Sequence, residues 1–484
     1  MADNTYDEVA EPCDEYKLMS PFWDMCDTLY AGTAAMREAG TKYLPKFEAT
    51  NQNDYSALLK RTVLLNMYHK AIQSIVGRAF KKPIMLQDDV PAGFATWAEN
   101  IDREGRSLNV FGKALLKSAL KHGMTHFMVD FPMTQAKTLA EQKQAGDRPY
   151  WVHMPAKEII GWQHEVVNGE KRLTQVRRWH KSKKASGAYG VKEVELITVY
   201  GINSFQVFEK VEGEKGGKER WVLAMDENGK PMEGATGVNY IPMVTYYTNR
   251  TGFMEAMPPL LDLAHKNIEH WQSSSDQRNI LTFSRIPVLY LFGLGDEDKP
   301  IKWGPAMSLR SANENAKAGF IEVSGAAIGA GKEDLETLKE EMAFLSLDPM
   351  LRQTGNTTAT ARALDESGTM SQLDGWMVEF KDSIEMGLQF TADRMGEKSG
   401  GSVSVNDKFS VTTDGESNAK VINECYVAGL IPKEVAQEAL RRCGLAALSE
   451  TLEEYDNEDL KAIFEAEQRS NPAFAGLAAG LRIP

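Results

Sequence analysis

The feature that most constrains the fold is a change of pattern over residues 150–250, where short strand-like segments replace helical ones. Clusters of Gly, Asn, Lys and Ser separate these segments, and Val167-Asn168-Gly169 suits a hairpin turn because Asn-Gly accepts positive φ. No helix-length pattern intervenes, so the stretch predicts an antiparallel meander rather than a βαβ series. The strands are expected at 151–154, 158–162, 173–180, 194–200, 205–209, 221–224 and 242–247.

Helical patterns precede this stretch. Ser20-Pro21 matches the usual order of an N-cap followed by proline at the first helical position. Gly123 suits the residue that follows a helix C-terminus. The first 20 residues are acidic and are expected to be flexible. The expected helices span 20–40, 53–82 and 108–121, and a strand is expected over 126–131.

Helices dominate again after residue 256. A helix over 257–286 begins with an apolar stripe and becomes entirely polar over 272–278, a pattern typical of a helix that projects from a core. The helix over 359–395 has an apolar stripe at helical spacing, made of Leu373, Met377, Phe380, Ile384, Leu388 and Met395. The other elements expected are strands at 287–292, 318–323 and 403–411, and helices at 333–347, 417–428, 433–443 and 451–468.

The net charge of the chain limits the kinds of molecule that it can be expected to bind. The net charge is −13 and the isoelectric point about 5.3. A protein that grips the grooves of nucleic acid is usually basic, because it must neutralise phosphates. Tight, sequence-reading DNA binding is therefore not expected, whereas a surface past which DNA slides is compatible with the charge. At 484 residues, 42% of them hydrophobic, the chain is long enough for two to four domains of about 100–200 residues each.

Cysteine content and hydropathy favour a chain made in a reducing compartment. Cys13, Cys26, Cys425 and Cys443 form no CxxC pair and are too few for a disulfide framework, so they are expected to be reduced thiols. Residues 1–16 lack the basic and apolar regions of a signal peptide. The longest apolar stretch, 286–294, contains a proline and is too short to span a bilayer.

The Gly-rich segment 325–332 raises the possibility of nucleotide binding. It is expected between a strand and a helix, where backbone amides can cradle phosphate. The P-loop pattern GxxxxGK[ST] fails twice, because Ala326 replaces the first glycine and Glu333 replaces the metal-binding hydroxyl. A flexible connector between strand and helix is therefore favoured, and a nucleotide-dependent enzyme using this loop is the alternative.

The spacing of two histidines and an aspartate suggests a metal site, but the residues between them argue against it. His122, His126 and Asp130 are four residues apart, as ligands on one helix would be. Gly123 and the strand-like run after it make a continuous helix unfavourable. His265 and His270 fall on different faces of a helix and are expected at the surface. No catalytic, cofactor-binding or metal site is predicted, and the chain is not expected to be an enzyme.

The order of the elements resembles that of the portal proteins of tailed bacteriophages, the head–tail connectors. The resemblance covers roughly residues 20–412 and lies in the order of segments more than in their identity. In that family, a wing of helices and strands leads through a segment like 240–249 to a stem helix like 260–264 onward. A small clip follows, with a strand ending in glycine, here 288–293. A second stem helix, a tunnel loop and a long wing helix, here entered through 361–366, complete the pattern.

This resemblance implies an α+β, portal-type fold with a helical and β wing, a two-helix stem, a small α/β clip and a helical crown. The divisions it implies are a flexible N-terminus (1–20), wing (21–256), first stem helix (257–286), clip (287–331), second stem helix (332–348), tunnel loop (349–358), long wing helix and strand (359–412), crown (413–470) and flexible tail (471–484).

The resemblance also implies a function. The protein would be a structural subunit of a virion, assembled in the host cytoplasm into a homo-oligomeric ring, commonly of twelve copies, at one capsid vertex. Double-stranded DNA would pass through the ring non-specifically during packaging and ejection. The implied partners are the large terminase subunit, the major capsid protein and the head–tail adaptor, with no membrane. Another minor head or tail component of the virion is the remaining alternative.

The polar tunnel loop is the candidate site under this resemblance. It has one charged residue, and Gly355 lets its backbone bend. A surface of this kind can touch a moving phosphate backbone without holding it, since hydroxyls and amides make weak, exchangeable hydrogen bonds. The residues expected to line the channel are Arg352, Gln353, Thr354, Asn356, Thr357 and Thr358.

Overall fold

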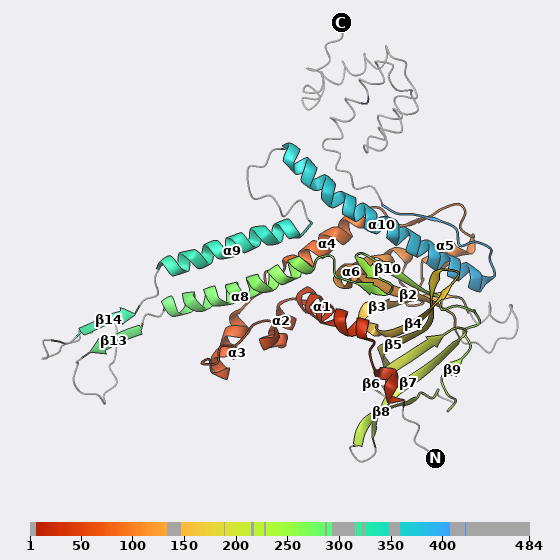
Figure 1. Ribbon diagram of the computed structural model, residues 1–484, viewed down its shortest axis with the longest axis horizontal. Helices are drawn as coiled ribbons and strands as arrows, with labels where there is room; N and C mark the ends of the chain where they lie inside the picture. Colours follow the sequence, from red (N-terminus) through yellow and green to blue (C-terminus); the bar gives the residue numbers. More distant parts are fainter. Residues whose placement is uncertain are drawn as a thin grey trace, which may run out of the picture. The chain divides into compact units, whose positions relative to one another are not determined.

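The computed structural model describes residues 6–132, 147–187, 189–213, 217–226, 229–285, 288–292, 315, 317–321, 325–347, 359–406 and 422. The chain divides into two compact units, one made of Met1–Gly355 and Gln372–Asp407 and the other of Asn356–Ser371 and Lys408–Pro484. All packing described below lies in the first unit. Its helices and antiparallel sheets confirm the expected α+β class (Figure 1). The helices expected between 417 and 468 lie outside the described residues, Ile422 excepted.

The N-terminal residues are ordered, so the expectation of a flexible segment over 1–20 is wrong from residue 6 onward. A 3-10 turn, η1 (Asp7–Ala10), precedes α1 (Asp14–Ala31). The Tyr6 amide donates to the carbonyl of Trp221 at 3.1 Å, and the Cys13 amide donates to the carbonyl of Ile160 at 2.9 Å. Residues 6–13 therefore form a strap across the larger β-sheet, and they are too well bonded to be free.

The first helices differ from the expected boundaries because packing and capping place their ends. Pro21 lies inside α1, since the burial of Met19 and Trp23 extends the helix before it. The helix expected over 53–82 is two helices. Asn66 caps the second, because its side chain accepts a hydrogen bond from the His69 amide at 2.9 Å. The described helices here are α2 (Thr33–Ala39), α3 (Gln52–Arg61), α4 (Met67–Ala79), α5 (Gly93–Ala98) and α6 (Leu108–His122).

Gly123 ends α6 as predicted. It has φ 83° and lies against the backbone of Met257, so the position needs both the left-handed conformation and the absence of a side chain. A three-stranded antiparallel sheet follows, in the order β10 (Met243–Tyr247), β2 (Met124–Asp130), β3 (Tyr150–Pro155). Its core contains the stacked rings of Phe127 and Trp151, whose centroids are 4.5 Å apart.

The predicted meander is confirmed for five of its seven expected strands, whereas those at 151–154 and 242–247 pair with β2 in the three-stranded sheet. One antiparallel sheet has its strands in chain order from β4 to β8, and short β9 pairs with β7. Asn168 and Gly169 form the predicted hairpin turn, with φ values of 53° and 85°. The strands are β4 (Ile159–Val167), β5 (Glu170–Ser186), β6 (Gly190–Gly201), β7 (Ser204–Gly213), β8 (Gly217–Leu223) and β9 (Glu233–Gly234).

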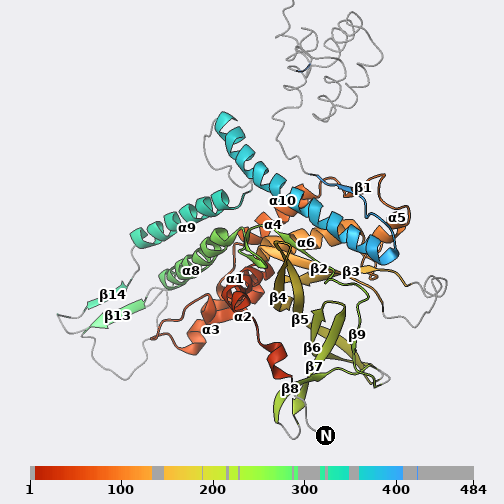
Figure 2. The same cartoon turned by 45° about the vertical axis from the view of Figure 1, so that its right-hand side comes forward.

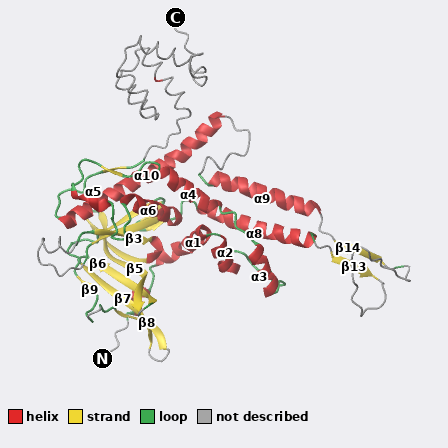
Figure 3. Cartoon of the chain, turned by 180° about the vertical axis from the view of Figure 1, so that it is seen from behind, coloured by secondary structure: helices red, strands yellow, loops and turns green. Residues whose placement is uncertain are grey.

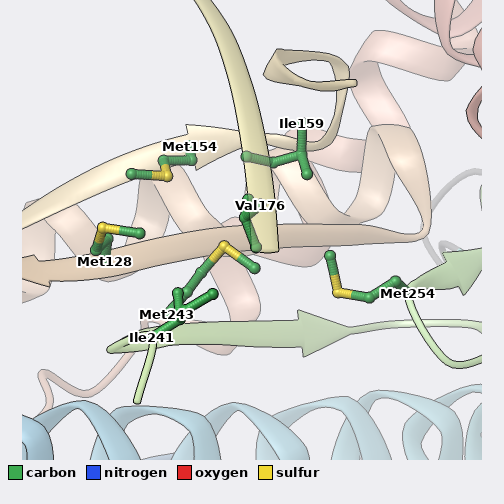
Figure 4. Close-up of a cluster of buried hydrophobic side chains, with 7 residues drawn as sticks. All are labelled: Met128, Met154, Ile159, Val176, Ile241, Met243 and Met254. Carbon is green, nitrogen blue, oxygen red and sulfur yellow. The ribbon is translucent and has the colours of Figure 1, made fainter. Parts of the chain in front are cut away.

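Methionines join the two sheets. Figure 4 shows side chains from the three-stranded sheet and the residue Ile241 before it, from β4 and β5 of the meander, and from the turn at residues 253–254, which meet in one apolar cluster. Because methionine is unbranched and flexible, it fills an irregular junction that a rigid side chain would leave with voids. The buried members are Met128, Met154, Ile159, Val176, Ile241, Met243 and Met254.

Three long helices complete the described chain: α8 (Leu261–Ser284), α9 (Gly325–Leu345) and α10 (Ala359–Met395). The predicted stripe of α10 is buried from Leu373 to Leu388, whereas Met395, in the last turn, is 42% exposed. The short strands are β1 (Met85–Leu86), which pairs with β15 (Val403–Ser404), β11 (Arg250–Gly252), which pairs with β12 (Glu255–Ala256), and β13 (Val288–Phe292), which pairs with β14 (Lys317–Ile321).

Candidate functional site

Helices α8 and α9 run antiparallel along each other, as Figures 1 and 3 show. Three polar contacts fix this direction, because the residue number rises along α8 as it falls along α9. Lys266 forms an ion pair with Glu341 at 2.8 Å, and Ser273 donates to Asp334 at 2.5 Å. The Gln277 amide donates to the carbonyl of Ile328 at 2.9 Å. In the chain, the β13–β14 strand pair lies between the two helices.

The opposite side of α8 is also polar and also covered. Asn267 accepts a hydrogen bond from the Tyr68 amide at 3.0 Å and donates to the carbonyl of Leu65 at 2.9 Å. The Ser275 hydroxyl lies 3.0 Å from the hydroxyl of Thr62. An α-helix turns about 100° per residue, so Ser275 faces away from the contacts with α9 and Asn267 lies about a quarter turn round the helix from them. Helix α8 is therefore enclosed between α9 and the α3–α4 region, with hydrogen bonds on both sides.

This enclosure corrects the expectation for the polar stretch 272–278. We expected it to project into solvent, but Ser274, Ser275 and Gln277 are all buried. For Ser275 and Gln277, hydrogen bonds to Thr62 and to the carbonyl of Ile328 offset the cost of burying the polar groups. The same packing corrects one histidine: His265 is exposed as expected, whereas His270 is buried, and burial lowers its pKa.

The Gly-rich segment 325–332 is helical. Helix α9 begins at Gly325, so the expected connector before residue 333 is wrong. Three alanines in the segment favour helix and offset the glycines. Gly331 has a packing reason, since a side chain there would meet the Gln277 amide. A helical backbone directs its amides along the axis, and only the first four lack intrahelical partners, so the segment does not form a phosphate-cradling loop.

The two histidines whose spacing first suggested a metal site make separate contacts, as expected from the break at Gly123. His122 ends α6 and lies 3.0 Å from Asp27, whose carboxylate also accepts from Lys121 at 2.6 Å. Burial lowers the pKa of His122, although Asp27 opposes that shift. His126 lies on β2 with its Nδ1 2.9 Å from the hydroxyl of Thr245. Within the described ranges, no group of three or more His, Cys, Asp or Glu could hold a metal ion.

The Asp27 cluster is a feature that sequence reasoning missed. Lys157 adds a second ion pair to Asp27 at 3.3 Å, which ties α1 to the segment between the two sheets. Burial alone would raise the pKa of Asp27, but the hydrogen bond and charge of His122, with Lys121, hold that pKa well below its usual range. The partners are about 95–130 residues away in sequence, so no local pattern signals them.

The predicted channel-lining residues, Arg352, Gln353, Thr354, Asn356, Thr357 and Thr358, lie outside the described residues. The structure does place the elements on either side of them: α9 ends at Leu345 and α10 begins at Ala359. The division of the chain into wing, stem, clip, tunnel loop and crown is likewise not tested and stays a prediction.

A family model matches this part of the chain. It describes a domain of unknown function, DUF4055, and covers residues 259–395. The match begins just before α8 and ends on the last residue of α10, so it includes the helical pair, the strand pair between them and the long helix. A comparison with curated proteins finds no match.

Three solved structures that match this chain come from gene transfer agent (GTA) particles. One is the neck of a native GTA particle computed with C12 symmetry, at a TM-score of 0.42 and 9% identity, covering 84% of this chain and 98% of that one. A second is the virion of a native gene transfer agent particle, at 0.40 and 10%, covering 84% and 98%. A third is the neck of an empty GTA particle computed with C6 symmetry, at 0.39 and 10%, covering 85% and 98%.

No helix among the described residues is both long and apolar enough to cross a membrane.

Proposed function

We propose that the protein is a portal subunit: a structural ring protein of a virion, through whose central channel double-stranded DNA is packaged and ejected. The observation that supports this most directly is the α8–α9 pair, whose helices are joined by polar contacts. In the chain, a pair of strands lies between the two helices, and the 37-residue α10 follows them. This is the order of stem, clip, stem and long wing helix that the sequence resembles.

The dimensions of the helical pair suit a channel wall. At 1.5 Å per residue, α8 and α9 are each about 30–36 Å long, which equals the rise of about ten base pairs of duplex. A ring of such pairs would surround roughly one turn of DNA. The pair contributes structure rather than chemistry, since its polar groups bond mainly to one another and to α3 and α4.

The charge of the chain suits transit rather than binding. For twelve copies, the formal charge would sum to 12 × −13 = −156. An acidic ring repels phosphates, so DNA would slide through without releasing the counterions that drive tight binding. The exposed carboxylates of α9, among them Glu333, Glu336 and Glu340, agree with this.

The polar segment 352–358 is proposed, on its sequence, to line the narrowest part of the channel. Replacing Asn356, Thr357 and Thr358 by lysine would add 3 × 12 = 36 positive charges to a twelve-fold ring. Counterion release should then hold the DNA and shorten the packaged length. Full-length packaging at the normal rate would show that this segment does not face DNA. The matched control places lysine at three exposed positions of the hairpin formed by β5 and β6.

The proposed partners follow from the ring. They are further copies of this chain, the large terminase subunit during packaging, the major capsid protein around the vertex and the head–tail adaptor afterwards. Assembly would take place in the host cytoplasm and the mature location would be the virion. The catalytic alternative, a nucleotide-dependent enzyme, is not supported by the helical conformation of 325–332.

Negative-stain imaging and native mass of the purified full chain test the proposal. We expect rings with a central hole and a mass near a dozen subunits. A monodisperse monomer at high protein concentration and moderate salt would refute the ring. Discs or fibres without a hole would instead favour another minor head or tail component.

A further inference from the structure

Two segments of the chain carry no acidic residue. Asp and Glu account for 68 of the 484 residues, yet none occurs between Asp54 and Asp88 or between Glu104 and Asp130. These segments contain α4 and α6, which contact each other and lie next to each other in Figures 1 and 2. Two helices without a carboxylate therefore pack together in a chain whose net charge is −13.

Both helices present lysines to solvent at helical spacing. The exposed residues of α4, with residue 81 just past its end, are three or four positions apart, and two lysines of α6 are four positions apart. Residues at this spacing share one side of a helix, so each set forms a stripe. The six residues, which we call the basic strip, are exposed or, for the last, partly exposed: Lys70, Gln73, Gly77, Lys81, Lys113 and Lys117.

Contacts at both ends bring the two stripes onto one surface. The Lys113 ammonium lies 5.9 Å from the centre of the Phe80 ring, at the end of α4. Toward the start of α4, Gln73 donates to the Tyr30 hydroxyl at 2.7 Å, and Lys121 lies 5.4 Å from the centre of the Tyr30 ring. The residue number rises along α4 as it falls along α6, so the helices are antiparallel and their outward stripes run side by side.

The four lysines of the basic strip have no carboxylate within ion-pair distance among the residues that the structure describes. Lys121 continues the stripe of α6 but is left out of the strip, because its ammonium is 2.6 Å from Asp27. At the start of α6, Asp102 and Glu104 both pair with Arg106. The carboxylates at the two ends of α6 are therefore engaged, and the strip presents four unbalanced positive charges.

The two exposed carboxylates of α10 beside Phe380 face other parts of the molecule. The Phe380 ring packs against Phe80 at the end of α4, with the ring centroids 5.7 Å apart. Asp382 lies about 200° further round α10 and so points away from α4. Glu379 is turned about 100° from Phe380 and lies close enough to Arg250 for the two charges to interact. Neither carboxylate cancels the charge of the strip.

Gly77 leaves the middle of the strip without a side chain. A methyl group there would meet no atom within 4 Å, so packing within the chain does not require glycine. Glycine inside a helix is less stable than alanine, so the residue has a cost that the fold itself does not explain. A position without a side chain allows a partner to approach the helix closely. A partner that lies across the strip accounts for the glycine.

We infer that the basic strip is a contact site for the phosphate backbone of double-stranded DNA, in addition to the segment 352–358 proposed to line the channel. The inference rests on the proposed function, which supplies the duplex. The strip is about 16 Å long from Lys70 to Lys81, and one strand of a duplex carries about five phosphates over that length. Each of the four lysines can therefore meet a phosphate of one strand.

The composition of the surface favours nucleic acid over a protein partner. A protein interface needs an apolar core, whereas Val110 is the one large exposed apolar side chain in α4 and α6, both of which are described in full. Lysine is a flexible, hydrated point charge, which suits phosphate contacts that carry no sequence information. Four such contacts are weak and sensitive to salt, so they would hold the duplex loosely and permit transit.

Duplex binding by the purified full chain tests the site. The probe is a fluorescein-labelled duplex of about 12 base pairs, followed by anisotropy between about 25 and 150 mM salt. For four phosphate contacts, the logarithm of the binding constant should fall with the logarithm of the salt concentration with a slope of about −4. The glutamine variant, with Lys70→Gln, Lys113→Gln and Lys117→Gln, should have a slope of about −1 and bind at least about tenfold more weakly at the lowest salt.

The matched control removes the same charge elsewhere. Lys171→Gln, Lys183→Gln and Lys192→Gln replace three exposed lysines of β5 and β6, and this variant should keep the wild-type slope. An arginine variant, with arginine at the same three strip positions, keeps the charge and should bind like the wild type. Equal binding by the glutamine variant, the control and the wild type would overturn the inference.

A substitution without charge tests the shape of the site. Gly77→Gln should raise the melting temperature, because glutamine favours helix. It should also weaken duplex binding severalfold, because its side chain would stand between α4 and the duplex. Since this variant is expected to be more stable than the wild type, its loss of binding cannot come from misfolding. Unchanged binding would contradict a duplex that lies across the strip.

Two further measurements separate the competing explanations. If polyglutamate at equal charge concentration displaces the labelled duplex as well as unlabelled duplex does, the strip fits an acidic protein and the inference fails. Negative-stain imaging of the same samples tests the proposed function. Rings whose duplex binding is unaffected by the strip variants overturn the inference alone, whereas binding that depends on the strip in a protein without rings overturns the proposed function alone.

Discussion

Replacing His126 by phenylalanine should make the protein less sensitive to acid. His126 lies on β2 and is fully buried, with only the hydroxyl of Thr245 within hydrogen-bonding distance among the described residues. Burial, together with smaller contributions from charge repulsion by His153 and His122, lowers the pKa of His126 to about 3. The folded protein therefore keeps this ring neutral at pH values where an unfolded chain would protonate it.

The sign and size of the effect follow from that difference. Above pH 6.5, the ordinary value, neither state holds the proton and the full stability is present. As the pH falls from 6.5 toward 3, the unfolded state gains a proton that the folded state does not, so stability is lost at about 1.4 kcal/mol per pH unit. At about pH 4.5, the titration of His126 alone should have lowered the free energy of unfolding by about 2–3 kcal/mol relative to neutral pH.

Urea unfolding followed by tryptophan fluorescence at about pH 7 and about pH 4.5 measures the loss. The His126→Phe variant keeps an aromatic ring and removes the titration, so its loss should be about 2–3 kcal/mol smaller than that of the wild type. Part of the slope should remain, because burial also lowers the pKa of His153 to about 4. His265→Phe, at an exposed position of α8, is the matched control. Equal losses in all three proteins would refute the reasoning.

Three further predictions concern packing, the strap and nucleotide binding. Gly387→Ala would place a methyl group 2.5 Å from the Phe127 ring and should lower the free energy of unfolding by about 1–3 kcal/mol. Gly375→Ala, in open space on the same helix, should raise it by up to about 1 kcal/mol, and thermal melting of the two variants distinguishes these outcomes. Deleting residues 2–12 should lower the unfolding free energy by about 1–2 kcal/mol in urea, because the hydrogen bonds that Tyr6, Asp7 and Val9 make to the sheet are lost and only that of Cys13 remains. Lys332→Ala should leave calorimetric titration with ATP unchanged, and saturable ATP binding abolished by this substitution would overturn the structural interpretation of α9.

Local patterns predicted the elements that depend on local chemistry. Alternating strands with turn residues gave the meander, and Asn168-Gly169 gave its first hairpin, because positive φ is a property of those two residues. The end of α6 at Gly123 followed for the same reason. The stripe of α10 was predicted because burial of every third or fourth residue needs only one apolar surface beneath the helix.

The elements that depend on distant partners were not predictable. Helix α1 begins early because Trp23 packs against residues of the sheet region and donates to the carbonyl of His122 at 2.9 Å, 99 residues away. The break before α4 rests on one cap at Asn66, which a continuous apolar pattern conceals. Apolar periodicity and capping patterns describe one segment in isolation, whereas these helix boundaries are set by the residues that the segment contacts.

The clearest error has the most bearing on function. Polar residues over 272–278 were interpreted as solvent-facing, yet α8 buries Ser275 and Gln277 between two neighbouring helices. An apolar seam holds helices by surface area and tolerates many relative positions, whereas a polar seam stabilises only the positions in which its hydrogen bonds are made. A helix with such seams on both sides has a defined place between α9 and α3. In the proposed ring, these seams would give α8 the same orientation in every copy, and a constant orientation of each subunit is what a closed, symmetric assembly requires.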